Sequence, residues 1–504
     1  MPAEKLIDLT PDKLASGMFP SAEPASGETW NTGSNVWFRE LSVEQVLGRV
    51  KAANLVSASP PRSSQAMQQQ FTTDGHKRIF FEDGGIIKYI QDPVLGTVVP
   101  GASVNQIGTL SSTGDYDLET WGDWIAATDG TVWSSTPGTP PGSTATGSLQ
   151  LWKNTGSLAV VPDAATQFKS VKILKRLAQM LLAYNTDVLP TGFHWSDAND
   201  PTVWIPSSTV AARNLNIRNL GSPIVAVCNL GIGHGVYASD ALLVVQYLGP
   251  NQWFGTPNQA LIGIGAVSKH SVVAVGQTNF GLSRAGVFAT DGSSFQYIDR
   301  PAIDKWIQQN VDWTRASKIA GYYNDKLGLV IWAVPLIGGQ NNTYGTVAVD
   351  PKTRQATAET LYLNRRTFTY LDNKVGFGIE RMVFDYPVIS QVDGIYFDSV
   401  INTLSGNFTL STNLFDGGMP EIYKMWDYMI SPGSYGPDAQ VQFGFTDIPD
   451  LSTVQWGSWT PLSVRVPFPD GPRESVYLAI NFQSQNMFRL AGIKVYGEKG
   501  GLVN

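Results

Sequence analysis

The dipeptide Asp-Gly recurs between an apolar stretch and an aromatic residue. Its four copies are FEDGGIIKYI (81–90), ATDGTVW (127–133), ATDGSSFQYI (289–298) and QVDGIYF (391–397). Asp-Gly tolerates the positive φ that both central residues of a type I′ turn need, and the twist of that turn matches a β-hairpin. We expect the aromatic after each turn to lie on the core face of the returning strand. The repeat therefore predicts β-hairpins from residue 83 to residue 394.

The composition agrees with a turn-rich β protein. Charged residues make up only 15% of the 504-residue chain, which contains 50 Gly, 30 Pro and 15 Trp. Hairpins of this kind cannot bury both faces alone, and radial repetition into a propeller protects their edges. The predicted fold class is mainly β: a β-propeller-like body of consecutive hairpins plus a C-terminal β-sandwich, with few short helices. The irregular spacing of the repeat does not give the number of blades.

Changes in the sequence pattern divide the chain into three predicted regions. Residues 1–60 form an N-terminal arm with the first strands, and 61–404 form the propeller-like body, with an exposed low-complexity loop at 135–148. Residues 405–504 contain alternating strands without the Asp-Gly pattern and are predicted to form the C-terminal β-sandwich.

Three segments have a less uniform pattern. Residues 35–50 allow either a short helix, for which Ser42 and Gln45 would form a capping box, or two short strands around a turn. Residues 171–184 have helical propensity, but their apolar positions also suit two strands, and we favour strands. The clearest helix is 299–311, with Asp299 as its N-cap.

Charge and cysteine content restrict the function. The net charge is −7, whereas a protein that grips nucleic acid normally has a basic excess. An acidic wall would still let DNA pass without sticking. The single cysteine, Cys228, excludes a disulfide framework and suits a reducing cytoplasm. We expect no signal peptide and no membrane span.

Residues that could carry chemistry are scattered. His76, His194, His234 and His270 lack metal-ligand spacing and are interpreted as isolated surface or turn residues. A glycosidase needs two facing carboxylates, for which the acidic segment 115–124 supplies Asp115, Asp117, Glu119 and Asp123. An exposed loop beside a Trp-anchored strand is the favoured explanation of this segment, because carboxylates on loops are common. We therefore predict no catalytic residue, cofactor or metal, and expect that the chain is not an enzyme.

Four phrases of the sequence resemble one known family. They are WNTGSNVWFRE (30–40), HWSDANDPTVW (194–204), NFGLSRAGVFATDGSSFQYIDRPAIDKWI (279–307) and RLAGIKVYGEKGG (489–501). Together they resemble the tail nozzle or tail-hub proteins of short-tailed phages, which are similar to the packaged-DNA-stabilising tail proteins. The resemblance implies a propeller body with accessory β domains.

The same resemblance implies a structural virion protein. About six copies would form a ring beneath the portal and adaptor. The ring would be the distal DNA-exit channel, pass double-stranded DNA without specific binding and carry tail fibres. Such a protein is located in the virion tail and assembles in the host cytoplasm. Trp30, Trp37 and Phe38 are candidate anchors between subunits, because aromatic residues dominate interfaces, and they are equally good core residues.

Two other functions fit the sequence. A glycan-binding or glycan-cleaving β-propeller would use the acidic segment as its sugar groove. A scaffold for protein–protein contacts inside a cell is a third hypothesis. Light scattering separates the first two, since a nozzle forms a large ring and a glycan-cleaving propeller acts as a monomer.

Overall fold

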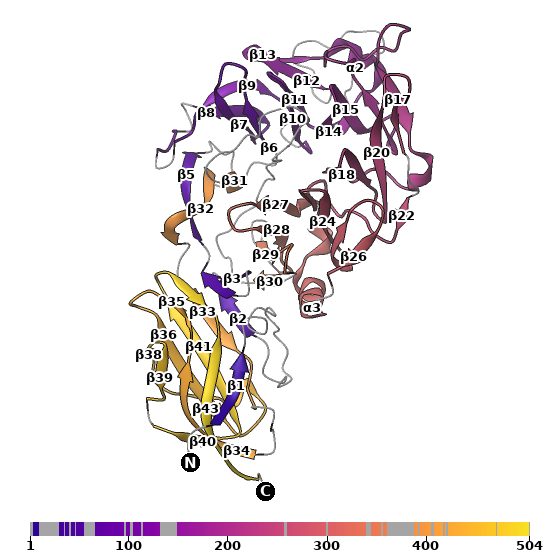
Figure 1. The fold of residues 1–504 in the computed structure, drawn as a ribbon. Helices are drawn as coiled ribbons and strands as arrows, with labels where there is room; N and C mark the ends of the chain where they lie inside the picture. The colour runs from indigo at the N-terminus through magenta and orange to yellow at the C-terminus, as the bar shows by residue number, and fades with distance from the viewer. Residues whose placement is uncertain are drawn as a thin grey trace.

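A computed structural model gives the arrangement of the chain. It describes residues 4–9, 30–34, 36–39, 42–45, 47–54, 66–94, 97–100, 104–111, 114–131, 149–256, 260–298, 301–338, 344–353, 356–359, 388–391, 394–404, 408–416, 419, 422–469 and 471–502. These residues form two bodies (Figure 1). The first spans residues 66–359 and is named the propeller body. The second contains strands from both ends of the chain and is named the terminal body.

Six antiparallel sheets follow one another along the described part of the propeller body, and each is a meander of four consecutive strands, with a fifth strand added in one case. The first three sheets are β6 (Met67–Phe71), β7 (Lys77–Asp83), β8 (Ile86–Gln91) and β9 (Asn105–Thr109); β10 (Asp117–Trp121), β11 (Trp124–Thr128), β12 (Gln150–Lys153) and β13 (Thr155–Val160); and β14 (Val171–Leu177), β15 (Met180–Thr186), β16 (Gly192–Trp195) and β17 (Arg213–Asn216).

The last three sheets repeat this order. They are β18 (Ala226–Leu230), β19 (Gly233–Tyr237), β20 (Ala241–Gly249) and β21 (Trp253–Gly255), with β22 (Leu261–Ile262) also paired to β20; β23 (Val272–Val275), β24 (Thr278–Ser283), β25 (Gly286–Thr290) and β26 (Phe295–Tyr297); and β27 (Ala320–Asn324), β28 (Leu329–Pro335), β29 (Tyr344–Val349) and β30 (Ala356–Glu359). The helical segments between sheets are α2 (Pro162–Gln167), η2 (Arg218–Leu220), α3 (Pro301–Asn310) and η3 (Trp313–Lys318).

The hydrophobic core of this body lies between neighbouring sheets. Phe80 of the first sheet packs in one cluster with Leu118 of the second, and Tyr184 of the third packs with Val245 of the fourth. Val273 of the fifth sheet shares a cluster with Trp332 of the sixth. A sheet that is apolar on both faces must bury both, and stacking the sheets around an axis does this. The predicted β-propeller-like body is thus confirmed.

Exposure changes from the centre of the propeller body outward. The first strands of consecutive sheets lie beside one another, from β6 and β10 through β14 and β18 to β23 and β27. Figure 1 shows β6, β10, β14 and β18 toward the middle and β9, β13 and β17 outside. All residues of the third sheet's β15 and β16 are buried, whereas those of its outer strand β17 are exposed or half-buried. The first strands of the sheets therefore lie nearest the axis of the propeller body.

The Asp-Gly segments differ in detail from the type I′ prediction. Gly84, Gly130 and Gly292 have positive φ, whereas Asp83, Asp129 and Asp291 do not. Between β25 and β26 the Asp291 carboxylate instead accepts hydrogen bonds from the backbone N–H groups of Ser293 and Ser294, both at 2.9 Å. The aspartate therefore stabilises the turn through its side chain.

The residue that follows the turn also differs from the prediction. Phe295, the first aromatic after Asp291, is 37% exposed, so it does not lie on the core face. The copies at 127–133 and 391–397 fall partly outside the described residues.

The terminal body joins strands that are far apart in the sequence. One sheet contains β1 (Glu4–Leu9), β43 (Ile493–Leu502), β34 (Ile422–Ile430), β39 (Arg465–Pro467) and β40 (Arg473–Ser475). A second contains β2 (Trp30–Ser34), β33 (Phe408–Thr412), β41 (Tyr477–Ser484), β36 (Gln440–Thr446), β37 (Gln455–Trp456) and β38 (Thr460–Pro461). A third contains β3 (Val36–Arg39), β4 (Ser42–Gln45), β42 (Phe488–Leu490) and β35 (Gly433–Tyr435).

One further sheet of three strands and one short helix complete the described fold. The sheet of β31 (Val388–Gln391), β32 (Gly394–Leu404) and β5 (Leu47–Asn54) again pairs an early strand with a late one, and η4 (Leu451–Thr453) follows β36. Both chain ends lie at the foot of the terminal body (Figure 1). One hydrophobic cluster, which includes Leu6, Trp30 and Val495, joins strands from the two ends of the chain.

The structure decides the three segments whose sequence pattern is less uniform. Strands β3 (Val36–Arg39) and β4 (Ser42–Gln45) pair with each other, with Ser42 opposite Arg39, so the capping-box alternative is wrong. The preference for strands at 171–184 is confirmed by β14 and β15. The predicted helix is α3, while its expected N-cap Asp299 and the loop 135–148 lie outside the described residues. No helix in the described ranges is long and apolar enough to cross a membrane.

Candidate functional site

Polar side chains from four successive sheets meet at the axis of the propeller body. Asp117 comes from β10, Lys175 from β14 and Cys228 from β18, and Lys269 and His270 immediately precede β23. They enclose a cavity of about 10 Å³, which is room for about one water molecule. We name these five residues the axial cluster. The meander topology explains it, because each sheet begins at the axis.

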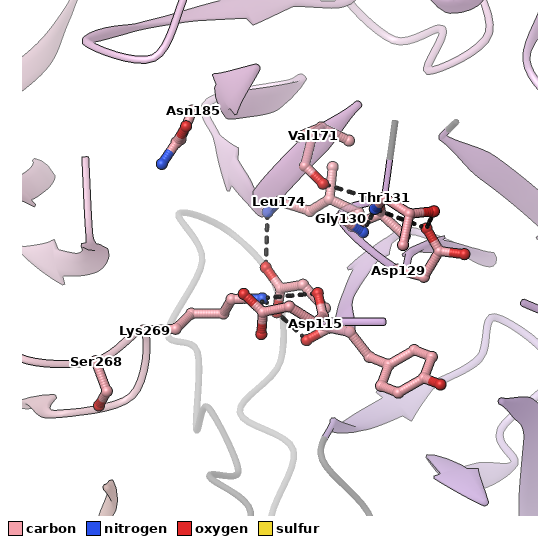
Figure 2. A network of polar contacts seen from close by, with 12 residues as sticks. Asp115, Asp129, Gly130, Thr131, Val171, Leu174, Asn185, Ser268 and Lys269 are labelled. Carbon is pink, nitrogen blue, oxygen red and sulfur yellow. Dashed lines mark hydrogen bonds and ion pairs between the residues drawn. The ribbon is translucent and has the colours of Figure 1, made fainter. Parts of the chain in front are cut away.

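Lys269 bridges across the axis to the second sheet. Its Nζ lies 3.1 Å from Oδ1 of Asp115 and donates to the backbone carbonyls of Asp115 at 3.1 Å and Tyr116 at 3.0 Å (Figure 2). The Lys269 side chain is 9% exposed, whereas that of Asp115 is 69% exposed. Desolvation raises the pKa of Asp115, but the attraction of Lys269 is strong enough to lower it overall. The two carbonyls and the carboxylate together compensate the buried ammonium.

Asp117 connects the second and third sheets. Its Oδ2 accepts a hydrogen bond of 2.7 Å from the backbone N–H of Leu174, and Asp117 is 4% exposed. A second link lies nearby, where Thr128 Oγ1 donates to the carbonyl of Val171 at 2.9 Å (Figure 2). Charge-assisted bonds to backbone N–H groups are among the stronger hydrogen bonds in proteins. Asp117 therefore holds β10 and β14 in register at the axis.

The pKa of His270, a member of the axial cluster, is shifted from its ordinary value. Burial lowers the pKa of His270 to about 4, although the charge of Asp117 opposes this shift. The imidazole is therefore neutral at pH 7. A carboxylate beside a neutral imidazole is a combination used for proton transfer. The cavity is far smaller than the several hundred Å³ typical of small-molecule pockets, so a sugar would require the axis to open.

Only part of the predicted acidic segment lies at this site. Asp115 and Asp117 lie there, but Glu119 is fully buried within β10. Asp123 lies in the turn after β10, roughly 20 Å away along the strand. Its carboxylate accepts hydrogen bonds from Thr73 N at 2.9 Å and Thr73 Oγ1 at 2.6 Å. The four residues therefore do not form one acid/base group.

The interpretation of the histidines as isolated surface or turn residues is wrong for His194, His234 and His270, the last of which lines the axial cavity. His234 in β19 is fully buried, and it lies 2.9 Å from Tyr184 Oη and 3.1 Å from the Arg176 carbonyl. Burial lowers its pKa to about 3, and burial likewise lowers the pKa of His194 to about 4. His76 does lie at an exposed turn, 2.6 Å from Asp92. The described residues contain no group of three or more side chains suited to a metal.

The candidate interface residues have different places. Trp30 is 1% exposed and contacts Phe482 edge-on, with ring centroids 6.2 Å apart, so it is a core residue of the terminal body. Trp37 and Phe38 lie in β3, paired with Glu44 and Val43. The side chains of these two residues are outside the described part of the structure.

Sequence reasoning missed the basic half of the axial cluster. Lys175 comes from the third sheet, and Lys269 and His270 both come from the fifth, so no spacing in the sequence connects them to Asp117 in the second. The one usable signal is positional, because each residue lies in, or just before, the first strand of its sheet. That signal requires the strand boundaries, which the irregular repeat did not supply.

Comparisons with known proteins give structural likenesses alone. No family model and no curated protein matches the chain. Similar solved structures include YCF48 from Cyanidioschyzon merolae, at 11% identity, covering 70% of this chain and 98% of that one with a TM-score of 0.28. An α-L-arabinanase from Penicillium chrysogenum, complexed with arabinobiose, has 11% identity, coverage of 61% and 98%, and a TM-score of 0.30. An exo-β-1,3-galactanase from Phanerochaete chrysosporium has 8% identity, coverage of 89% and 99%, and a TM-score of 0.26.

The prediction that the chain is not an enzyme is withdrawn. Two of the three structures are enzymes named for the glycans they act on. The prediction relied on the absence of a catalytic motif in the sequence. In a propeller, however, groups at the axis come from separate sheets, so an axial site needs no linear motif. The prediction is therefore corrected.

Proposed function

We propose that the chain is a structural subunit of the tail nozzle of a short-tailed phage. The observation that carries this proposal is the pairing of a propeller body with a second β body in which both chain ends are built into the sheets. In such a chain neither end can separate without breaking sheet hydrogen bonds, as when β1 pairs with β43 from Glu4↔Gly497 to Leu9↔Ile493. A channel wall that withstands pressure needs this kind of rigidity.

The four phrases that resemble tail nozzle proteins support the proposal through their positions. The first phrase forms β2 and β3, and the last forms β42 and β43, so both belong to the terminal body. The phrase at 194–204 contains Trp204, which is 2% exposed and donates from Nε1 to the Pro201 carbonyl at 2.8 Å. The phrase at 279–307 forms β24 to β26 and α3. Two of the phrases thus lie in strands of the terminal body, and the other two lie in elements of the propeller body.

The proposal includes partners and location. About six copies form a ring that binds the portal–adaptor complex on one side and tail fibres around it. Double-stranded DNA passes through the ring without specific binding, for which a net charge of −7 is suitable. The ring belongs to the virion tail and assembles in the host cytoplasm.

Mass photometry of the purified chain tests this proposal. The chain is measured alone and after mixing with the portal and adaptor proteins encoded in the same genome. The expected result is a closed ring of about six copies, formed alone or upon mixing. A chain that stays a single copy in both conditions contradicts the proposal.

A second candidate function is glycan cleavage by the propeller body. It is favoured by the position of Asp115 and Asp117 beside His270 at the axis, where the four sheets meet. Its test is the release of reducing sugar from galactan and arabinan between pH 4 and pH 8. Release that is lost in Asp117→Asn supports this candidate, provided that the variant keeps the thermal stability of the parent. No release from either polymer contradicts it.

A further inference from the structure

Among the described residues of the second sheet of the terminal body, a group of neighbouring outward positions on β33, β36 and β41 carries uncharged polar side chains. Phe443 and Phe482 point into the core, so their neighbours along β36 and β41 point outward. We name six outward residues the amide face; they are Thr409, Ser411, Gln440, Gln442, Asn481 and Gln483. All six are exposed or half-buried. Figure 1 shows their strands, β33, β41 and β36, side by side.

Hydrogen bonds link these side chains across the strands. Ser411 Oγ donates to Asn481 Oδ1, and Asn481 Nδ2 donates to Gln442 Oε1 at 3.3 Å. Gln483 Nε2 donates to Gln440 Oε1 at 2.6 Å. Each amide offers two donor and two acceptor positions, of which these contacts use only a part. The amide groups are therefore held in fixed orientations while keeping capacity toward an external partner.

Two tryptophans border the amide face. Trp456 lies on β37 opposite Gly444, the next outward position after Gln442, and Trp459 lies in the segment that leads to β38. Each is 37% exposed. Gln442 Nε2 donates to the Gly457 carbonyl at 2.8 Å, which ties this segment to the amide face. A residue larger than glycine at 444 would collide with the Trp456 ring, so the indole rests directly on the sheet.

This chemistry selects among the possible partners. A nucleic-acid surface needs Lys or Arg, and none of the six outward residues is charged. A stable protein interface usually has an apolar centre with a polar rim, whereas here the centre is polar and the aromatics are at the rim. An uncharged polymer rich in hydroxyl groups, with apolar ring faces, matches both parts. We propose that the amide face with Trp456 and Trp459 binds an uncharged polysaccharide.

Binding at this surface requires two kinds of contact. The amides donate to and accept from sugar hydroxyls, which are themselves both donors and acceptors. The exposed part of the Trp456 indole stacks on the apolar face of a sugar ring, a contact that excludes water from both. Because the amides are already held by one another, little side-chain entropy is lost when the sugar binds. This surface is separate from the axial cluster and does not depend on the proposed ring assembly.

Affinity electrophoresis of the full chain tests the proposal. The chain is run in native gels that contain dextran, barley β-glucan, galactan or arabinan, with polygalacturonate as a charged polymer. We expect retardation by at least one neutral polymer. Trp456→Ala should weaken that retardation at least tenfold, Gln483→Ala about threefold, and Trp456→Phe should retain most of it.

Controls keep the result interpretable. Ile448→Ala removes an apolar side chain that is 56% exposed and lies outside the amide face, so its retardation should equal that of the parent. Thermal melts establish whether each variant is folded, and Gln483→Ala serves if Trp456→Ala is not. Retardation by none of the neutral polymers overturns the proposal, as does retardation that survives both substitutions. Self-association that is lost in Trp456→Ala would assign the surface to a second copy instead and would also overturn it.

Discussion

The propeller body and the terminal body are both antiparallel β structures, yet the chain builds them in opposite ways. In the propeller body each sheet consists of consecutive strands, such as β14 to β17 within residues 171–216. In the terminal body β1 pairs with β43 and β2 pairs with β33, so its sheets need both ends of the chain. Pairing over such separations carries a larger loop-closure entropy. We infer that the propeller body folds first and brings the two ends together.

Deletion of residues 1–34 should have the largest effect on this comparison. It removes β1, β2 and the core residue Trp30 from the terminal body and removes nothing from the propeller body. Hydrogen exchange should therefore lose protection in β33, β41 and β43 and keep it in β15 and β28. Equal loss of protection in both bodies would show that they fold as one unit.

Substitution of a buried tryptophan in each body is the next largest test. Trp30→Ala and Trp332→Ala each remove a side chain that is 1% or less exposed, and each should cost about 3–5 kcal/mol. Limited proteolysis in intermediate urea should cut Trp30→Ala first within the terminal body and Trp332→Ala first within the propeller body. The same cleavage pattern for both variants would contradict two separate cores.

Acidification should weaken the propeller body more than the terminal body, since all four histidines of the chain lie between residues 76 and 270. The pKa of His234 is lowered to about 3 and that of His194 to about 4, from an ordinary value of 6.5. The unfolded chain therefore binds more protons than the folded chain below pH 6.5. His194 and His234 should each remove about 1.4 kcal/mol of unfolding free energy per pH unit from pH 6.5 down to their own folded pKa values.

Urea unfolding of the full chain at pH 7, 6, 5 and 4 measures this slope. His234→Gln should reduce this slope by the equivalent of about one bound proton, because the imidazole is buried between Tyr184 and the Arg176 carbonyl. The carbonyl accepts only, so Nε2 carries the proton and Nδ1 accepts from the tyrosine. A slope unchanged by this substitution would contradict the neutral, buried state of His234.

The smallest expected effect concerns a surface turn. Hydrogen bonds from the backbone N–H groups of Ser294 and Ser293 lower the pKa of Asp291 to about 2. Because the folded pKa lies below the unfolded value, this stabilisation is complete above about pH 4 and fades as the pH falls toward 2. Asp291 is exposed, so Asp291→Ala should cost about 1 kcal/mol or less at pH 7.

The corresponding substitution in the terminal body is Asp450→Ala, where the carboxylate accepts from Ser452 N at 2.8 Å. Differential scanning calorimetry at pH 7 and pH 3 should show a gap between Asp291→Ala and the parent that narrows on acidification. A gap that is constant over this range would mean that the carboxylate charge does not act in the turn.

The contrast between the bodies also explains what the sequence could predict. Local signals identified the hairpins at 171–184 and 289–298 and the helix α3, because those elements depend on neighbours in the chain. No local signal connects Glu4 with Gly497, since the pairing is decided by tertiary packing. For the same reason, the sequence pointed to the acidic part of the axial cluster and missed its basic part. Asp117 lies in the predicted acidic segment, while Lys269 and His270 arrive from a sheet about 150 residues later.

Electron cryomicroscopy of the full chain, alone and with its portal–adaptor complex, tests the central claim most directly. The account predicts a closed ring of about six copies in which the propeller bodies surround an open channel and the axis of each propeller stays filled. Single molecules in both samples, or a single chain with a polysaccharide bound across Asp115 and Asp117, would contradict the nozzle and favour a glycan-cleaving propeller.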